Sequence, residues 1–204
     1  DDSGDHQGAI DDYNKALEIN PSSAFTYYNR GIAKSNLSDD QGAINDYNKA
    51  LEIDPKHLKA YVNRGSAKDK IGDYHGAIAD HTKALEIDPS SAVAYYNRGV
   101  AKSYLSDHQG AIADYSKVIE IDSRHASAYN DRGNRNSELG NYQAAIDDYN
   151  KAIAINPKNA NFYINRGVAK DELEDYQGAI VDYNKALEIN PQHADAYSTR
   201  GFTK

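Results

Sequence analysis

The histidines are the first candidates for chemistry in this chain. They are His6, His57, His75, His81, His108, His125 and His193. Most fall in predicted turns or at the starts of predicted helices, and His57, His125 and His193 recur too far apart to share a metal ion. His81 stands where equivalent positions carry tyrosine, and we interpret it as a packing residue. The histidine spacing therefore predicts no metal site.

The carboxylates offer no catalytic pair either. Adjacent acids such as Asp147 and Asp148 share a predicted helix and point apart, so they cannot act together as an acid and a base. The sequence has no cysteine, and it contains no HExxH motif, phosphate-binding loop or dinucleotide fingerprint. We expect no enzymatic activity and no cofactor.

The overall charge is acidic, with 31 Asp and Glu against 23 Lys and Arg and a formal net charge of -8. That balance argues against binding to a nucleic-acid duplex, and no run approaches the roughly 18 apolar residues of a membrane span. We expect neither nucleic acid nor membrane as a partner. The opening DDSGD leads to no signal peptide, which slightly favours the cytoplasm and leaves the compartment otherwise open. Because the chain has no Met, we interpret it as a piece of something longer.

Charged residues do recur in a regular arrangement. Arginine falls every 34 residues, at Arg30, Arg64, Arg98, Arg132, Arg166 and Arg200, and aspartate at the same interval, at Asp12, Asp46, Asp80, Asp114, Asp148 and Asp182. Each arginine shares a helix face with packing residues such as Tyr27 and with a second cation such as Lys34. Because an unpaired charge is intolerable on a packed face, we predict Arg-to-Asp ion pairs along the seam between successive helices.

An internal repeat must position these residues. Proline recurs at Pro21, Pro55, Pro89, Pro157 and Pro191, with Ser123 in the missing place. In the repeat 21–54, residues at helical spacing predict two amphipathic helices, over residues 24–37 and 40–53. Pro55 ends the second helix, since proline lacks the backbone N–H and disfavours helical geometry in the residue before it. Each repeat is predicted to be a helical hairpin.

A hairpin of this size cannot bury its apolar stripe alone, so it must stack on neighbours. Gly31 and its equivalents lie mid-helix despite a cost of about 1 kcal/mol relative to alanine. We expect the missing side chain to allow a close approach to Ala43 and Ala50, with the Tyr27 and Tyr47 rings filling the flanks. The predicted core is made of small residues and tyrosines.

Period, helix pair and composition together resemble the tetratricopeptide repeat family. Its signature small and aromatic positions map onto Tyr27, Gly31, Ala43, Tyr47, Ala50 and Pro55, and likewise in the later repeats. The resemblance covers the whole chain and implies an all-α, right-handed solenoid of stacked helix-turn-helix hairpins in a single domain. Its full repeats are 21–54, 55–88, 89–122, 123–156 and 157–190, with a lone second helix in 1–20 and a lone first helix in 191–204. Two departures are Arg30 and its equivalents, where the family usually has Leu, and a second column where it usually has Tyr. That column holds Lys34, Lys68, Lys102, Asn136, Lys170 and Lys204.

The resemblance also implies a peptide groove along the first helices, which line the concave face in the family. The implied groove residues are Tyr28, Asn29, Ile32, Val62, Asn63, Ser66, Tyr96, Asn97, Val100, Asn130, Asp131, Asn134, Ile164, Asn165 and Val168. They alternate apolar side chains with amides, and an amide can both donate to and accept from an extended peptide backbone. The alternative is that Asn29 and its equivalents form hydrogen bonds within the solenoid.

Some relatives bind chaperone C-termini through a carboxylate clamp of Lys, Asn and Arg. That clamp is not assembled in this sequence, because the slot for its first Lys holds Tyr28, Val62, Tyr96, Asn130 and Ile164. Chaperone tails are therefore not expected partners.

Three functions remain at this stage. The leading hypothesis is a scaffold that binds an extended peptide or a partner surface in the groove. The second is a structural array in which copies stack head to tail, because the lone helices at the two ends together make one repeat. The third is a regulatory arm of an enzyme encoded elsewhere. A simpler explanation of the lone helices is that the chain is a fragment whose flanking repeats are missing.

Overall fold

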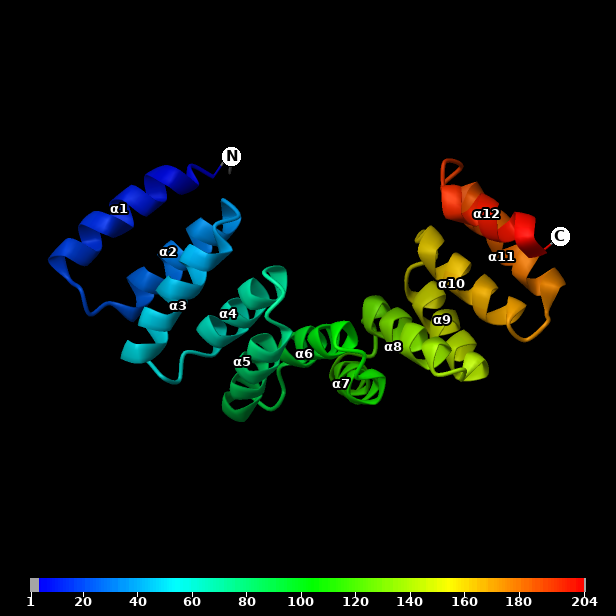
Figure 1. The fold of residues 1–204 in the computed structure, drawn as a ribbon, viewed down its shortest axis with the longest axis horizontal. Coiled ribbons are helices and arrows are strands. Elements are labelled where there is room, and N and C mark those ends of the chain that lie inside the picture. Colours follow the sequence, from blue (N-terminus) through cyan, green and yellow to red (C-terminus); the bar gives the residue numbers. More distant parts are fainter. Residues whose placement is uncertain (1–3, 204) are drawn as a thin grey trace. The chain divides into compact units, whose positions relative to one another are not determined.

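The computed structural model describes residues 4–203, and Lys204 of the lysine column lies outside them. Within this range the chain forms twelve α-helices joined by short turns (Figure 1). They are α1 (His6–Ile19), α2 (Ala24–Asn36), α3 (Asp40–Ile53), α4 (Leu58–Lys70), α5 (Tyr74–Ile87), α6 (Ala92–Tyr104), α7 (His108–Ile121), α8 (Ala126–Glu138), α9 (Tyr142–Ile155), α10 (Ala160–Asp171), α11 (Tyr176–Ile189) and α12 (Ala194–Thr203). The predicted helices of the repeat 21–54 are confirmed as α2 and α3.

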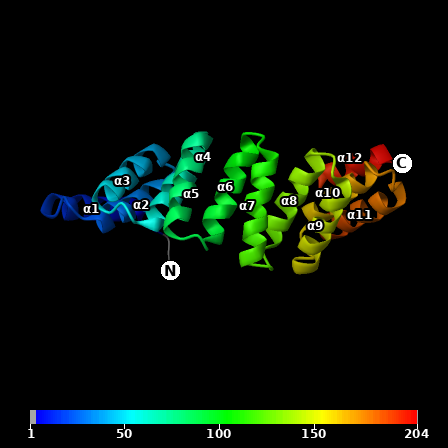
Figure 2. The same cartoon turned by 90° about the horizontal axis from the view of Figure 1, so that it is seen from below.

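The chain divides into two compact units. The N-terminal unit ends at Leu105, and the C-terminal unit begins at Ser106. In the N-terminal unit, α2 pairs with α3 and α4 with α5 as antiparallel hairpins, and α1 and α6 pack on the outer faces of this stack. In the C-terminal unit, α8 pairs with α9 and α10 with α11, flanked by α7 and α12. Figure 2 shows the side-by-side order of neighbouring helices within each unit. The all-α solenoid of stacked hairpins is therefore confirmed.

The start of each second helix is set by a side-chain cap. Asp39 accepts a hydrogen bond from the backbone N–H of Gly42, and the acids at the equivalent positions of α1, α5, α7 and α11 do the same. A Cβ on Gly42 would lie 2.0 Å from the Asp39 carboxylate, so a larger residue there would displace the carboxylate from its present position. The helix α9 has Asn141 and Ala144 in these two places, and Asn141 makes no such bond. The capping acid and the glycine are therefore lost together.

The core is built from alanines and tyrosines, as predicted. Ala43 and Ala50 are fully buried and Tyr47 is 2% exposed. The reason for Gly31 differs from the prediction, because its backbone faces the Tyr47 ring and not the two alanines. A Cβ on Gly31 would lie 2.6 Å from Tyr47 Cε1, well inside the van der Waals distance. The glycine therefore makes room for the aromatic ring, and the ring then fills the space between the two helices of the hairpin.

Candidate functional site

The first helices are held on the second helices by the predicted ion pairs. Arg30 Nη2 lies 2.6 Å from Asp46 Oδ1, and its Nε donates to Asp46 Oδ2 at 2.9 Å. Asp46 is 3% exposed and also accepts Lys34 Nζ at 2.8 Å. Arg30 Nη1 donates to Asn14 on the preceding helix at 2.7 Å. One guanidinium therefore joins three helices, and the bonds to Asp46 raise the pKa of Arg30 above its ordinary value.

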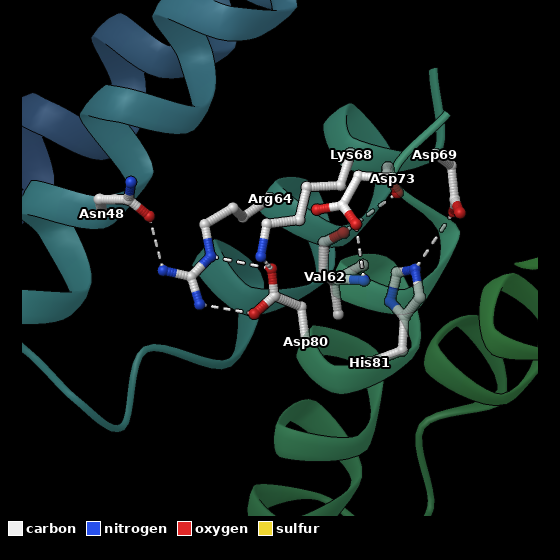
Figure 3. A network of polar contacts seen from close by, with 10 residues as sticks. Asn48, Val62, Arg64, Lys68, Asp69, Asp73, Asp80 and His81 are labelled. Carbon is white, nitrogen blue, oxygen red and sulfur yellow. Dashed lines mark hydrogen bonds and ion pairs between the residues drawn. The ribbon is translucent and has the colours of Figure 1, made fainter. Parts of the chain in front are cut away.

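The same pairing recurs along each unit. Arg64 contacts Asp80, Arg132 contacts Asp148 and Arg166 contacts Asp182, each through Nη2 at 2.5 to 2.6 Å. Figure 3 shows Arg64 between Asn48 and Asp80, with Lys68 beside the same carboxylate. Both oxygens of the Asp80 carboxylate thus accept hydrogen bonds from the Arg64 guanidinium, and Lys68 adds a second positive charge beside it. This contact orients α2, α4, α8 and α10 on their partner helices and so decides which of their side chains face outward.

His81 of α5 occupies the position that holds tyrosine in the other described second helices. It follows Asp80 directly and lies next to the Arg64–Asp80 pair (Figure 3). It is fully buried against Gly65, as Tyr47 is against Gly31. Its Nε2 is 3.5 Å from Asp69 Oδ2, and neither ring nitrogen makes a hydrogen bond. The ring fills the space of a tyrosine but leaves polar atoms unsatisfied.

In the N-terminal unit, the predicted groove residues form a connected polar row across α2, α4 and α6. Asn63 Nδ2 donates to the Tyr28 hydroxyl at 3.1 Å, and Asn97 Nδ2 donates to Ser66 Oγ at 3.2 Å. Ser66 Oγ in turn donates to the Val62 carbonyl at 3.0 Å. We call this row, with Ile32, the amide face.

The amide face contains a hollow of about 190 Å³. It is lined by Ile32, Ser35, Asn36, Tyr47, Asn63 and Ser66. Ser35, Asn36 and Tyr47 were not among the predicted groove residues. The first two lie one turn after Ile32 on the same helix, and that helical spacing is the signal that could have identified them. Tyr47 comes from a second helix, and only the packed hairpin brings it to this surface.

Burial raises the pKa of two tyrosines at the amide face. Tyr28 packs against Tyr47, with ring centroids 6.0 Å apart, and against His57 at 4.6 Å. Desolvation raises the pKa of both tyrosines, and the hydrogen bond from Asn63 opposes this rise at Tyr28. Both hydroxyls therefore stay protonated at neutral pH. The hydrogen bond to the Tyr28 hydroxyl orients the Asn63 amide.

The C-terminal unit arranges the equivalent residues differently. Asn165 Nδ2 donates to Asn130 Oδ1 at 2.9 Å and to Asn134 Oδ1 at 3.1 Å. Tyr149 donates its hydroxyl proton to Asn134 at 2.9 Å, and Asn130 donates to Asp131 at 3.0 Å. Asn63, Asn97 and Asn165 thus all bond within the protein, which is the predicted alternative to ligand binding, and Asn165 does so with two acceptors.

Other predicted groove residues are placed as follows. Ile164 is 8% exposed and packs in a core cluster with Tyr163, Leu187 and Ala196. This corrects its predicted place in the groove, because the chain folds α12 over it. Val168 packs on the same cluster. Asn29 donates to the Phe25 carbonyl of its own helix at 2.9 Å, and Val62 joins a core cluster beside Ala94. Tyr96 and Val100 lie half-buried on α6.

Residues 4–203 show neither a metal-binding cluster nor a membrane-spanning helix. No group of three or more histidines and acids in that range is close enough to hold a metal ion. None of the helices there combines the length and the apolar composition needed to cross a bilayer.

Comparison with known proteins identifies the repeat. A family model described as TPR repeat matches residues 2–38, 70–103 and 133–170, and one described as Tetratricopeptide repeat matches residues 24–57, 92–125 and 160–193. No curated protein matches the chain significantly in sequence.

Three solved structures illustrate the likeness. The MamA protein is 30% identical, with a TM-score of 0.78 over 84% of this chain and 94% of that one. YrrB, described as a TPR protein with an unusual peptide-binding site, is 23% identical, with a TM-score of 0.80 over 94% of this chain and 99% of that one. PilF of Pseudomonas aeruginosa is 18% identical, with a TM-score of 0.82 over 98% of this chain and 90% of that one.

Proposed function

The chain belongs to the tetratricopeptide repeat family of protein–protein interaction scaffolds, and from this premise we propose that its N-terminal unit binds an extended peptide along the amide face. The peptide backbone lies against Asn63 and Asn97. A small apolar side chain of the peptide enters the hollow beside Ile32. The role is binding, with no catalytic step.

The observation that carries the proposal is the position of Asn63 at the edge of the hollow. Its amide donates to the Tyr28 hydroxyl at 3.1 Å, and Tyr47 lines the same hollow. A fixed amide costs less conformational entropy on binding than a free one. The hollow beside it combines the apolar surface of Ile32 with the hydroxyl of Ser66, which is the mixture that peptide-binding sites use.

The N-terminal unit suits a peptide better than the C-terminal unit does. Asn63 donates to the Tyr28 hydroxyl and Asn97 to Ser66 Oγ, whereas Asn165 donates to both Asn130 and Asn134. A peptide that competes for Asn165 must first break bonds within the protein. The peptide-binding site named in the description of YrrB gives a precedent for this kind of ligand on this fold.

The experiment is selection from a library of random linear peptides displayed on phage, followed by affinity measurement with the synthetic peptides. Ser66→Val is the main variant, because Val occupies the equivalent position at Val100 and Val168 and is therefore compatible with the helix pair. It fills the hollow and removes the hydroxyl that Asn97 uses. We expect the affinity of a selected peptide to fall at least tenfold.

Asn29→Ala is the matched control. Its amide bonds to its own helix, so its loss should leave peptide affinity unchanged. Circular dichroism verifies that both variants keep their helices. Failure to select any peptide, or equal affinity of the wild type and Ser66→Val, would overturn the proposal.

A further inference from the structure

We infer that the peptide bound along the amide face is acidic, with a carboxylate side chain that pairs with Lys59 and apolar side chains that pack on Phe25 and Val93. The inference rests on the proposed function and names the class of peptide. Phe25, Lys59 and Val93 are the second residues of α2, α4 and α6. We call these three residues the flanking row.

The flanking row lies beside the amide face. On α4 and α6, it precedes the amide-face residues Asn63 and Asn97 by four residues, and residues four apart share a face of a helix. On α2, Phe25 lies three residues before Tyr28, which is again one turn. The helices α2, α4 and α6 contact one another in turn. A peptide that crosses them along the amide face therefore runs within reach of the row.

Lys59 is a cation without an ion pair. The other three cations of α4 each contact an aspartate of α3 or α5. Lys59 is exposed, and no carboxylate lies within ion-pair distance of it among residues 4–203. Its position is unfavourable for the helix itself, because α4 begins at Leu58 and the N-terminus of a helix carries partial positive charge. A carboxylate of a ligand is attracted there by the lysine and by the helix terminus together.

The two neighbours of Lys59 in the row are exposed apolar side chains. Phe25 is 71% exposed and Val93 is 60% exposed. Val93 lies near the middle of the chain, so exposure at this position does not come from a chain end. Burying these side chains against a ligand removes apolar surface from water, which favours association. The equivalent residues of the C-terminal unit are Ser127 and Asn161, so that unit offers neither the cation nor the apolar contacts.

The spacing of the row sets the spacing of the peptide side chains. Packed helices lie about 8 to 10 Å apart. A peptide in the polyproline II conformation rises about 3.1 Å per residue with three residues per turn, so every third side chain points the same way at intervals of about 9 Å. This geometry gives one peptide side chain for each helix. The expected peptide therefore has an apolar, an acidic and an apolar residue at every third position. Its backbone makes no internal hydrogen bonds and can bond to the amides of Asn63 and Asn97.

The sequences of the peptides selected on phage give the first test. The wild-type chain should enrich Asp or Glu, with apolar residues three positions before and after it. A synthetic peptide of this kind should bind less tightly as the salt concentration rises, because the ion pair is exposed to solvent. Lys59→Glu should lower its affinity about fivefold or more, because the carboxylate then meets a like charge. Replacing the acid of the peptide with lysine should restore binding to this variant.

Lys56→Glu is the matched control. It makes the same change of charge on the turn before α4, outside the flanking row, and should change the affinity by less than about twofold. Val93→Ser tests the apolar contact and copies the residue found at Ser127. It should weaken binding of the acidic peptide without changing its salt dependence. All three substitutions lie at exposed positions, and circular dichroism verifies that the helices remain.

The outcomes separate this inference from the proposed function. Selected peptides that bind but lack the acidic and apolar pattern would overturn the inference and leave the peptide-binding function standing. The same holds if Lys59→Glu binds as the wild type does, if Lys56→Glu has an equal effect, or if the charge-exchanged peptide fails to regain affinity. A selection that yields no peptide overturns both.

Discussion

Arg64 and Asp80 lie 16 residues apart in the sequence and are joined by two hydrogen bonds, from Nε at 2.8 Å and from Nη2 at 2.5 Å. The carboxylate is 3% exposed, and Lys68 reaches its second oxygen at 2.9 Å. A forked guanidinium is more specific in geometry than a lysine would be. The pair therefore orients α4 on α5, and the amide face depends on that orientation.

Removing one buried carboxylate should be strongly destabilising. Asp46→Ala leaves Arg30 and Lys34 without their common partner, and breaking such a buried pair costs about 3 kcal/mol or more. Urea unfolding followed by circular dichroism measures the change. Asp12→Ala is the control at the equivalent exposed position and should change the free energy of unfolding by less than about 0.5 kcal/mol at low protein concentration. Equal effects of the two substitutions would contradict the role of burial.

Alanine substitutions at two equivalent glycines should change stability in opposite directions. Gly31→Ala places a Cβ 2.6 Å from the Tyr47 ring, and we expect it to lower stability by about 1 to 3 kcal/mol through overpacking. Gly201→Ala places a Cβ in open space and should raise helix stability by up to about 1 kcal/mol. Thermal unfolding at low concentration compares them. A stabilising Gly31→Ala would show that the ring can move aside.

Replacing His81 with tyrosine should stabilise the N-terminal unit. The histidine ring buries two nitrogens without hydrogen bonds, and such groups cost about 1 to 3 kcal/mol. At the equivalent position of α9, the Tyr149 hydroxyl donates a hydrogen bond to Asn134. In the hairpin that contains His81, the position equivalent to Asn134 is occupied by Ser66. We expect His81→Tyr to raise the free energy of unfolding by about 1 kcal/mol. His75→Tyr, at an exposed position, should have no effect.

Stability should fall in alkaline solution. Burial raises the pKa of Tyr47 and of Tyr149 well above the ordinary value of about 10. The folded state then keeps these protons after the unfolded chain has lost them, so the contribution is complete below pH 10 and declines as the pH rises above it. Denaturant unfolding between pH 8 and pH 11 measures the slope. Tyr47→Phe should make this slope shallower, and an unchanged slope would mean that Tyr47 titrates as an exposed phenol.

The sequence by itself determined the repeat, the helix boundaries and the pairing of arginine with aspartate. These follow from local rules, because proline spacing ends helices and helical periodicity places Arg30 on the same face as Tyr27 and Gly31. The need to neutralise a charge on a packed face then required a column of acids, and Asp46 and its equivalents supplied it. All of this information lies within one repeat.

Which partners the amide side chains bond to depended on the tertiary structure. The sequence offers similar amides at Asn63 and Asn165, yet one donates to the Tyr28 hydroxyl and the other bridges Asn130 and Asn134. The tertiary structure also placed Ile164 in the core and opened a hollow beside Ile32. These outcomes depend on rotamers chosen by packing between helices more than 30 residues apart, where distances of a few tenths of an ångström decide whether a hydrogen bond forms. Periodicity identifies which residues share a face of a helix. Only the packing of neighbouring helices determines which hydrogen-bonding groups of that face are already used within the protein.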